Sequence, residues 1–221
     1  MNGLFIEQAF TNPVHFVSWI VLVVFSICVH EYAHAATANR LGDDTAALLG
    51  HLSLNPLKQM GLLSLAMLAV LGFAWGQVPV NPARLRGGRR GDALVSLAGP
   101  LSNFWLSFCF LLMFILLLKF GDPVRSEVLL GFLATGALLN MMLCLFNLIP
   151  APPLDGWRIL TCFVTPLRNL DPRMLSQAAN LVLVVLLLGG IVRHLWKVAA
   201  AVVTWLLPES DQLAFLRALQ Q

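Results

Sequence analysis

The chain has 221 residues, of which 58% are hydrophobic and only 11% are charged, so it carries more apolar surface than a soluble domain of this size can bury. Its net charge is only +3, and its basic residues lie between apolar runs, where membrane orientation requires them. We therefore expect no nucleic-acid partner. Several long apolar runs, rather than one at the N-terminus, argue against a signal peptide as their source. The composition predicts a polytopic membrane protein in a lipid bilayer.

The first apolar run covers residues 14–38, which at 1.5 Å per residue is long enough to cross a hydrocarbon core of about 30 Å. Residues 48–54 are too short and too interrupted for a helix, and they predict a short strand or β-hairpin after this span. The next run, residues 62–76, would extend only about 22 Å as a helix. We expect it to enter the membrane without crossing it.

Basic residues flank this short run on both sides. Arg40 and Lys58 precede it, and four arginines follow it between residues 84 and 90. Short basic loops stay in the cytoplasm, so we expect both flanks inside and the N-terminus outside. In this orientation His30 and His34, near the end of the first span, lie nearer the cytoplasmic side, and so would an active site built on them. The absence of a targeting signal favours a prokaryotic inner membrane.

Two further spans are expected at residues 93–120 and 127–149, and the second ends at a proline-rich break, residues 150–153. A helix broken at membrane depth is tolerated only beside protein or a cavity. The last apolar region, residues 175–207, is too long for one ordinary span, and either a tilted helix or a span plus an interfacial segment would fit it.

These elements together predict one membrane-embedded domain over residues 1–221, with a catalytic core at about 14–165 and C-terminal helices at 175–207. Its fold class would be all-α, a bundle of about five to six transmembrane or re-entrant helices with a short β-hairpin. The cysteines stand singly in apolar stretches without a C-x-x-C pair, so we expect packing residues and not a disulfide or thiolate site. They are Cys28, Cys109, Cys144 and Cys162.

The sequence His30-Glu31-Tyr32-Ala33-His34 lies within the first span and has the pattern H-E-x-x-H. Residues i and i+4 share a helical face, so both imidazoles can bind one metal ion, at about 2.0 to 2.1 Å for zinc. Zinc lowers the pKa of a bound water toward about 7, and a neighbouring carboxylate such as Glu31 can take its proton. The pattern predicts peptide hydrolysis.

The position of this motif strengthens the prediction. An ionised carboxylate near the middle of an apolar helix costs about 3 kcal/mol on insertion scales, so such a cluster indicates function. The competing interpretation is structural: the histidines would hydrogen-bond between helices, and Glu31 would be protonated. A metal ion accounts for all three polar groups at once.

A catalytic zinc ion usually takes a third protein ligand and leaves its fourth position to water. Asp155 is the best intramembrane candidate, because it follows the prolines that break the fourth apolar run and would face a cavity there. The alternative is that Asp155 caps the helix that starts near Trp157.

Three motifs together resemble the site-2 protease family of intramembrane metalloproteases. They are H-E-x-x-H at residues 30–34, Asn147-Leu148-Ile149-Pro150 with Leu154-Asp155-Gly156, and Gly99-Pro100-Leu101-Ser102-Asn103, and the match extends from about residue 28 to residue 160. The resemblance implies one zinc ion held by His30, His34 and Asp155, with Glu31 as general base. It also implies that Asn147 contacts substrate near the metal. The family's larger members attach PDZ or CBS domains, for which no stretch is left here.

Substrates would be membrane proteins with transmembrane helices, cleaved by regulated intramembrane proteolysis. Their helices must unwind first, and the predicted strand around Leu52, or residues 77–82, could pair with the extended chain. Asn103 and Asn140 are further candidates for substrate binding, although hydrogen bonding between helices explains them about as well. The oligomeric state is open.

Two other functions are compatible with polar residues inside a membrane. Intramembrane His, Glu and Asp also mark ion paths, so a metal-ion or proton transporter is one alternative. The polar residues converge on one site, however, and no internal repeat is visible. An inactive scaffold that binds membrane proteins is the second alternative, and the presence of Glu31 argues against it.

Overall fold

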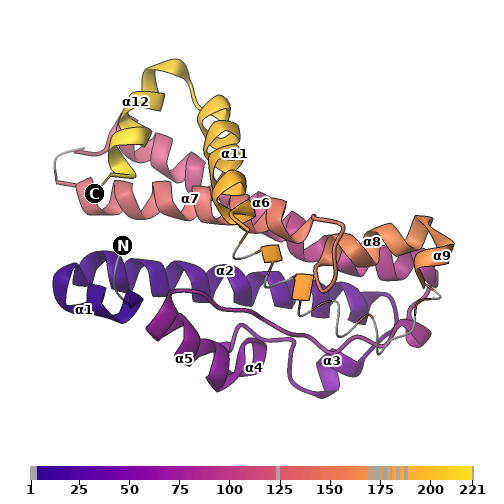
Figure 1. Ribbon diagram of the computed structural model, residues 1–221. Coiled ribbons are helices and arrows are strands. Elements are labelled where there is room, and N and C mark those ends of the chain that lie inside the picture. The colour runs from indigo at the N-terminus through magenta and orange to yellow at the C-terminus, as the bar shows by residue number, and fades with distance from the viewer. Residues whose placement is uncertain are drawn as a thin grey trace. The chain divides into compact units, whose positions relative to one another are not determined.

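The computed structural model describes residues 4–122, 125–168 and 189–220, together with residues 170, 175, 179, 181, 182, 185 and 186. These residues form two compact units, Met1–Gly99 and Pro100–Gln221, and the boundary falls inside one long helix, α6 (Arg89–Phe120). Each unit is described by itself (Figure 1).

The first unit is built on α2 (Pro13–Arg40), which carries the H-E-x-x-H motif. Pro13 occupies its first turn, where no backbone N–H is needed, and the Asn12 side chain accepts a hydrogen bond from the N–H of His15. The 28 residues extend about 42 Å, enough to cross a bilayer. Short helices precede and follow it: η1 (Phe5–Glu7), α1 (Gln8–Thr11), α3 (Thr45–Leu48), α4 (Pro56–Gln59) and η2 (Pro82–Arg84).

Helix α5 (Gly61–Leu71) and the extended residues 73–81 form a hairpin-like excursion from α4. The helix is only about 16 Å long and ends at Gly72, whose φ of 78° suits a glycine. The extended segment then returns along it, because the N–H of Gln77 binds the carbonyl of Gln59 at 2.9 Å. Both ends of the excursion therefore lie next to each other. That this segment enters the membrane without crossing it stays a prediction.

The prediction of a strand or β-hairpin after the first span is wrong: no strand is present among the described residues. Instead, Asp43 accepts hydrogen bonds from the N–H and hydroxyl of Thr45, which favours a helical turn at α3. The Gln59 side chain then donates to the carbonyls of His51 and Ser53, at 2.8 and 2.6 Å. An amide thus satisfies these carbonyls where a partner strand would otherwise be needed.

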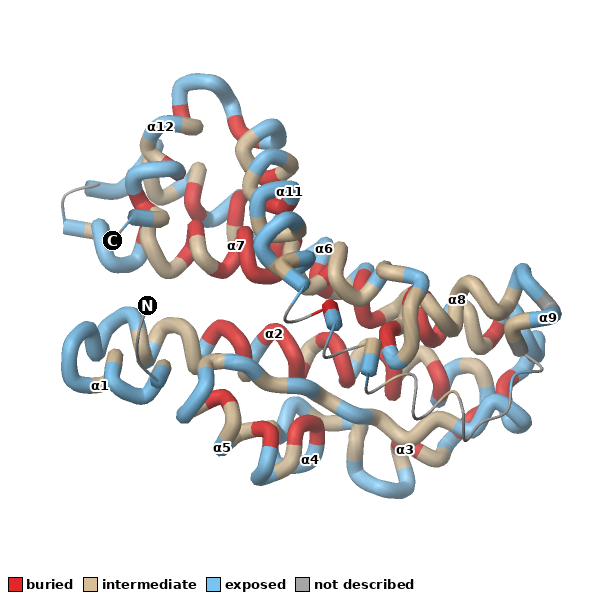
Figure 2. The backbone as a smooth tube through the Cα atoms, viewed as in Figure 1, coloured by how far each residue is buried: buried red, intermediate tan, exposed pale blue. Residues whose placement is uncertain are grey.

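The second unit contains the rest of α6 and a helix pair, α7 (Glu127–Asn147) and α11 (Ile191–Leu206), with α12 (Glu209–Ala218) packed against α7. Its core is a cluster of fully buried residues, seen as red segments of α7 and α11 in Figure 2. Phe114 and Phe215 meet edge to face in this cluster, with ring centroids 5.3 Å apart. The described part of this unit also contains two shorter helices, α8 (Asp155–Phe163) and α9 (Thr165–Arg168).

Three described helices are long and apolar enough to cross a membrane, namely α2, α6 and α7. They confirm the spans predicted at residues 14–38, 93–120 and 127–149. Fewer such helices are described than the five to six spanning or re-entrant helices expected. Much of the predicted C-terminal region, residues 175–207, lies outside the described residues, and its described end forms α11.

Candidate metal centre

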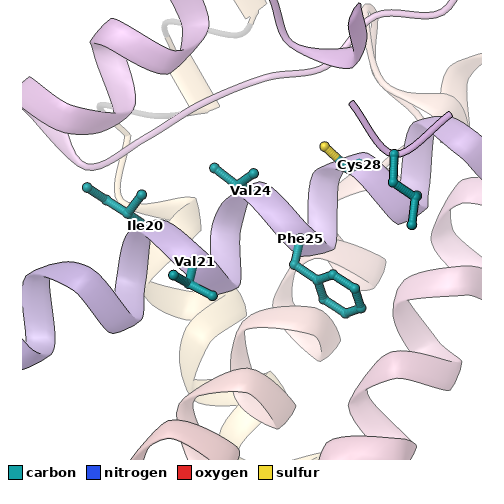
Figure 3. Close-up of a pocket in the computed structure, with 6 residues that line it drawn as sticks. Ile20, Val21, Val24, Phe25 and Cys28 are labelled. Atoms are coloured by element: carbon teal, nitrogen blue, oxygen red, sulfur yellow. The ribbon is translucent and has the colours of Figure 1, made fainter. Parts of the chain in front are cut away.

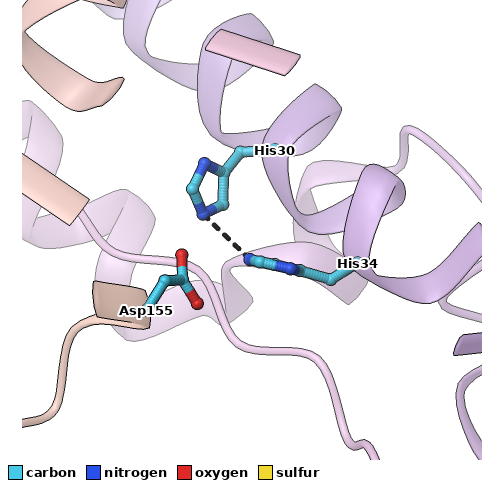
Figure 4. Close-up of side chains that lie close together, drawn as sticks. All are labelled: His30, His34 and Asp155. Atoms are coloured by element: carbon cyan, nitrogen blue, oxygen red, sulfur yellow. Dashed lines mark hydrogen bonds between the residues drawn. The ribbon is translucent and has the colours of Figure 1, made fainter. Parts of the chain in front are cut away.

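His30 and His34 lie on one face of α2, as the i, i+4 spacing predicts. Their Nε2 atoms are 3.0 Å apart and their ring planes are 82° apart, so both Nε2 atoms point at one spot (Figure 4). Two nitrogens bound tetrahedrally to one zinc ion at about 2.0 to 2.1 Å would be about 3.3 Å apart. The pair therefore has nearly the spacing that a shared metal ion requires.

The hydrogen bond on the far side of His34 fixes its tautomer. Its Nδ1 lies 2.7 Å from the backbone carbonyl of Val95, on α6, in a buried contact. A carbonyl oxygen can only accept, so Nδ1 carries the proton and Nε2 keeps its lone pair. Such second contacts orient histidine ligands and increase their basicity.

Two glycines leave room around these side chains. A Cβ on Gly99 would collide with the Nε2 atoms of both His30 and His34, so only glycine leaves their metal-binding side open. A Cβ on Gly76, in the extended segment, would collide with the carboxylate of Glu31. Glu31 is 8% exposed and thus buried beside a backbone that can approach it closely.

Asp155 is the first residue of α8, in the second unit. Leu154 and not Asp155 occupies the N-cap position, and no side chain caps the helix, so capping does not account for this acid. An acid in the first turn is favoured by the helix dipole. A Cβ on Gly156 would collide with the carbonyl oxygens of Leu148 and Ile149, so this glycine lets α8 start directly against the end of α7.

His30, His34 and Asp155 form a group that could hold a metal ion (Figure 4). Two imidazole nitrogens and one carboxylate are a donor set that zinc takes in catalytic sites, where the fourth position is left to water. The open side at Gly99 and the fixed tautomer of His34 agree with the same assignment. The residues present therefore fit zinc.

The remaining predicted site residues have other neighbours. Asn103 and Asn140 are fully buried and bind each other at 2.9 Å, and the Asn140 amide also donates to the carbonyl of Gly136. Asn147 ends α7 and donates to the carbonyl of Leu143. Contact of these amides with substrate stays a prediction. Leu52 lies in the turn after α3, so the strand on which its role was based does not exist.

An apolar pocket of about 310 Å³ lies on α2 next to the motif (Figure 3). Three of its lining residues, Ile20, Val24 and Cys28, follow one another at i, i+4 spacing, and Glu31 comes three residues later on the same side. The remaining lining residues are Val21, Phe25 and Leu54. This pocket can therefore accept an apolar group, such as a hydrocarbon side chain.

The sequence reasoning did not find the two glycines that shape the site. Gly99 was noted only as part of the G-P-x-x-N motif, and Gly76 was not singled out. A glycine inside a long apolar helix is a signal that something approaches closely, and this signal could have identified Gly99. Gly76 has no comparable signal, because glycine is common in irregular segments.

Comparison with known proteins identifies similar sequences that are described as zinc metalloproteases. The family model described as peptidase family M50 matches residues 118–190, a stretch that contains Asn147 and Asp155. "Putative zinc metalloprotease YwhC" of Bacillus subtilis is 38% identical over 151 residues, which cover 66% of this chain and 69% of that protein. "Putative zinc metalloprotease Rip2" of Mycolicibacterium smegmatis is 34% identical over 193 residues, which cover 80% of this chain and 70% of that protein.

Among solved structures, "Site-2 Protease from Methanocaldococcus jannaschii" matches 88% of this chain and 79% of that chain, with 23% identity and a TM-score of 0.47. The predicted membrane setting, zinc cofactor and metalloprotease class are confirmed by the family and by the relatives. The chain belongs to peptidase family M50, the site-2 protease family of membrane-embedded zinc metalloproteases.

Proposed function

We propose that this protease hydrolyses peptide bonds in or near the transmembrane segments of membrane proteins, with Glu31 as general base and Asp155 as the third zinc ligand. The observation that carries the proposal is the position of Glu31. It is buried on the membrane-length helix α2, between the paired histidines in sequence and directly against the backbone at Gly76. A site at this depth is suited to substrates that are themselves embedded in the membrane.

Zinc, when bound, supplies a Lewis acid that polarises the scissile carbonyl and makes water a nucleophile near neutral pH. The Glu31 carboxylate takes the proton of the attacking water and delivers it to the leaving amine. His34 keeps its Nε2 available because Val95 holds the proton at Nδ1. Asn147, at the end of α7, hydrogen-bonds the substrate backbone or the developing oxyanion.

The extended residues 73–81 receive the unwound substrate by backbone pairing. A helical substrate hides its carbonyls in i to i+4 bonds, so cleavage requires a stretch of it to unwind, and the freed groups need partners. The backbones of Gly76, Val78 and Val80 have no hydrogen bond within the described part of the chain. Gly76 also lies against Glu31, so a chain paired here would pass the general base.

The apolar pocket on α2 takes a side chain of the substrate. Its lining residues are hydrocarbon or thiol, and their row along the helix leads to Glu31. An apolar residue near the scissile bond would therefore be preferred, which agrees with substrates drawn from transmembrane segments.

The membrane is proposed to be a prokaryotic inner membrane, with the active site toward the cytoplasm. In support, α2 ends at Arg40, Arg86 donates to the carbonyl of Arg40, and Arg84 pairs with Asp44 just after this helix, so basic residues gather at this end of α2. Single cysteines placed at residues 80–90 should react with an impermeant thiol reagent only when the cytoplasmic face is open. Labelling from the outer face alone would reverse the orientation.

The decisive experiment compares wild type with Glu31→Gln in reconstituted vesicles that contain a single-span substrate. We expect equal zinc in both proteins, cleavage by wild type only, and loss of that cleavage with a strong chelator. Cleavage by Glu31→Gln at the wild-type rate would refute the role of the base. Ion flux without proteolysis would favour a transporter, and substrate binding without cleavage a scaffold.

A further inference from the structure

Two buried side chains far from the metal ligands hold the extended segment 73–81 in place. Ser64, on α5, is fully buried, and its hydroxyl accepts from the N–H of Trp75 at 2.9 Å while donating to the carbonyl of Trp75 at 2.7 Å. One hydroxyl thus exchanges two hydrogen bonds with one residue, as an opposing residue does in an antiparallel pair of strands. Ser64 takes the place of a missing partner strand.

Asp43 holds the other end of the segment. It is fully buried, and its Oδ2 accepts from the N–H of Asn81 at 2.6 Å. Its own N–H binds the carbonyl of Ala38, in the last turns of α2, at 3.0 Å. Through its carboxylate and its backbone N–H, Asp43 therefore connects the end of the segment to the helix that carries Glu31.

The backbone hydrogen bonds of residues 73–81 involve every second residue, as in an extended chain bonded along one edge. Trp75, Gln77 and Asn81 are bonded on one edge, and Pro79 between them has no N–H to bond. Side-chain exposure also alternates residue by residue from Phe73 to Val78. Since successive residues of an extended chain face opposite ways, the opposite edge belongs to residues 76, 78 and 80.

We propose that Ser64 and Asp43 are positioning residues that fix the register of residues 75–81 relative to Glu31, and so determine which peptide bond of the substrate is cleaved. This inference rests on the proposed pairing of substrate with residues 76–80. A side-chain period of two means that an unanchored segment can slip by two residues and still present the same face. Without its anchors, the segment would hold the substrate less tightly and in more than one register.

The test uses the full-length protein in vesicles with a single-span substrate whose product ends are read by mass spectrometry. Ser64→Ala and Asp43→Asn should keep wild-type zinc and kcat, raise KM about tenfold, and give extra products displaced by two residues. Ser64→Thr keeps the hydroxyl and should restore the wild-type KM and a single cleavage site. Ser53→Ala is the matched control, because this hydroxyl only donates to the exposed turn carbonyl of Gly50.

Unchanged KM and product ends in Ser64→Ala would overturn the inference, as would a loss of zinc and kcat at constant KM, which indicates support of the metal site alone. If Ser64→Ala does not fold, Asp43→Asn tests the same register from the other end of the segment. If wild type cleaves, Glu31→Gln does not, and the Ser64 and Asp43 variants behave like wild type, this inference is refuted and the proposed function stands. A wild type that does not cleave would refute the proposed function itself.

Discussion

The backbone carbonyl of Val95, on α6, accepts a buried hydrogen bond of 2.7 Å from Nδ1 of His34, on α2. This bond connects a motif residue to a helix 61 positions further along the chain. It has two consequences that can be separated: it sets the tautomer of His34 for metal binding, and it joins α2 to α6 by a buried hydrogen bond.

His34→Gln should therefore reduce stability even when no metal is bound. In excess chelator, we expect the free energy of unfolding in detergent to fall by about 0.5–1.5 kcal/mol, since a buried hydrogen bond between α2 and α6 is lost. The control is His194→Gln, because His194 makes the same kind of imidazole-to-carbonyl contact, at 3.0 Å to Gly190, in an exposed position. Equal unfolding midpoints for both variants and wild type would contradict the structural role of this bond.

Gly99→Ala should remove zinc without altering a ligand. The new Cβ would collide with Nε2 of both His30 and His34, so we expect the zinc affinity to fall by about 10–100-fold or more, as for losses of second contacts around a metal. The measurement is zinc content after dialysis against a graded chelator.

Gly136→Ala is a matched control for that experiment. Gly136 is also a helical glycine, and a Cβ there would meet the ring of Phe110 at 2.8 Å, away from the histidines in sequence and unit. Overpacking should cost about 1–3 kcal/mol of stability, with normal zinc in the folded protein. A wild-type zinc content in Gly99→Ala would show that the histidines can move aside. Glycine at position 99 would then not be needed to keep the metal site open.

The parts of the fold and site that the sequence predicted are those with strong local signals. Apolar run length predicted α2, α6 and α7, and the i, i+4 spacing predicted that His30 and His34 converge. Both signals depend only on helix geometry, which neighbours cannot easily change. Their success says little about the segments in between.

The strand prediction failed because side chains took over what a partner strand would do. Residues 48–54 are too short and too interrupted for a helix of any length, but Asp43 nucleates a turn at Thr45 and Gln59 binds the carbonyls that follow. The Gln59 bonds reach back six and eight residues, and the pattern of residues 48–54 does not indicate them. The same reason explains why Ser64 and Asp43 were not identified, since their partners, Trp75 and Asn81, are 11 and 38 positions away.

Asp43 should make stability depend on pH in acid. Burial alone would raise the pKa of Asp43, but hydrogen bonds from Thr45 and Asn81 outweigh it and lower the pKa below its ordinary value of about 3.9. The stabilisation is thus fully present above about pH 4 and is lost as the pH falls through the lowered folded-state pKa.

Asp43→Asn lacks this contribution, so its denaturation midpoint should lie below that of wild type at about pH 7, and the difference should narrow at about pH 3. Asp44→Asn serves as the control, since it breaks only an exposed ion pair with Arg84 and should change the midpoint little at either pH. If the denaturation midpoints of Asp43→Asn and wild type differ by the same amount at both pH values, the charge of Asp43 is not what stabilises the turn.

Asn103 and Asn140 should behave as a coupled pair that joins α6 to α7. Both are fully buried, and the Nδ2 of Asn103 donates to the Oδ1 of Asn140 at 2.9 Å. In a double-mutant cycle with alanine, each single change should cost about 1–3 kcal/mol, because it leaves a buried amide with one partner fewer. The double variant should be less destabilised than the sum, with a coupling of about 0.6 kcal/mol, the average for hydrogen bonds between membrane helices.

The same variants address the prediction that these amides bind substrate. If their role is confined to the helix pair, KM for a single-span substrate should stay at the wild-type value in every variant that folds, while the unfolding midpoint falls. A raised KM in Asn140→Ala at unchanged stability would instead support direct contact with substrate. If KM rises in Asn140→Ala, the Asn103→Ala variant decides the cause. A disturbed helix pair would raise KM in both variants, whereas a direct substrate contact by Asn140 would leave the KM of Asn103→Ala at the wild-type value.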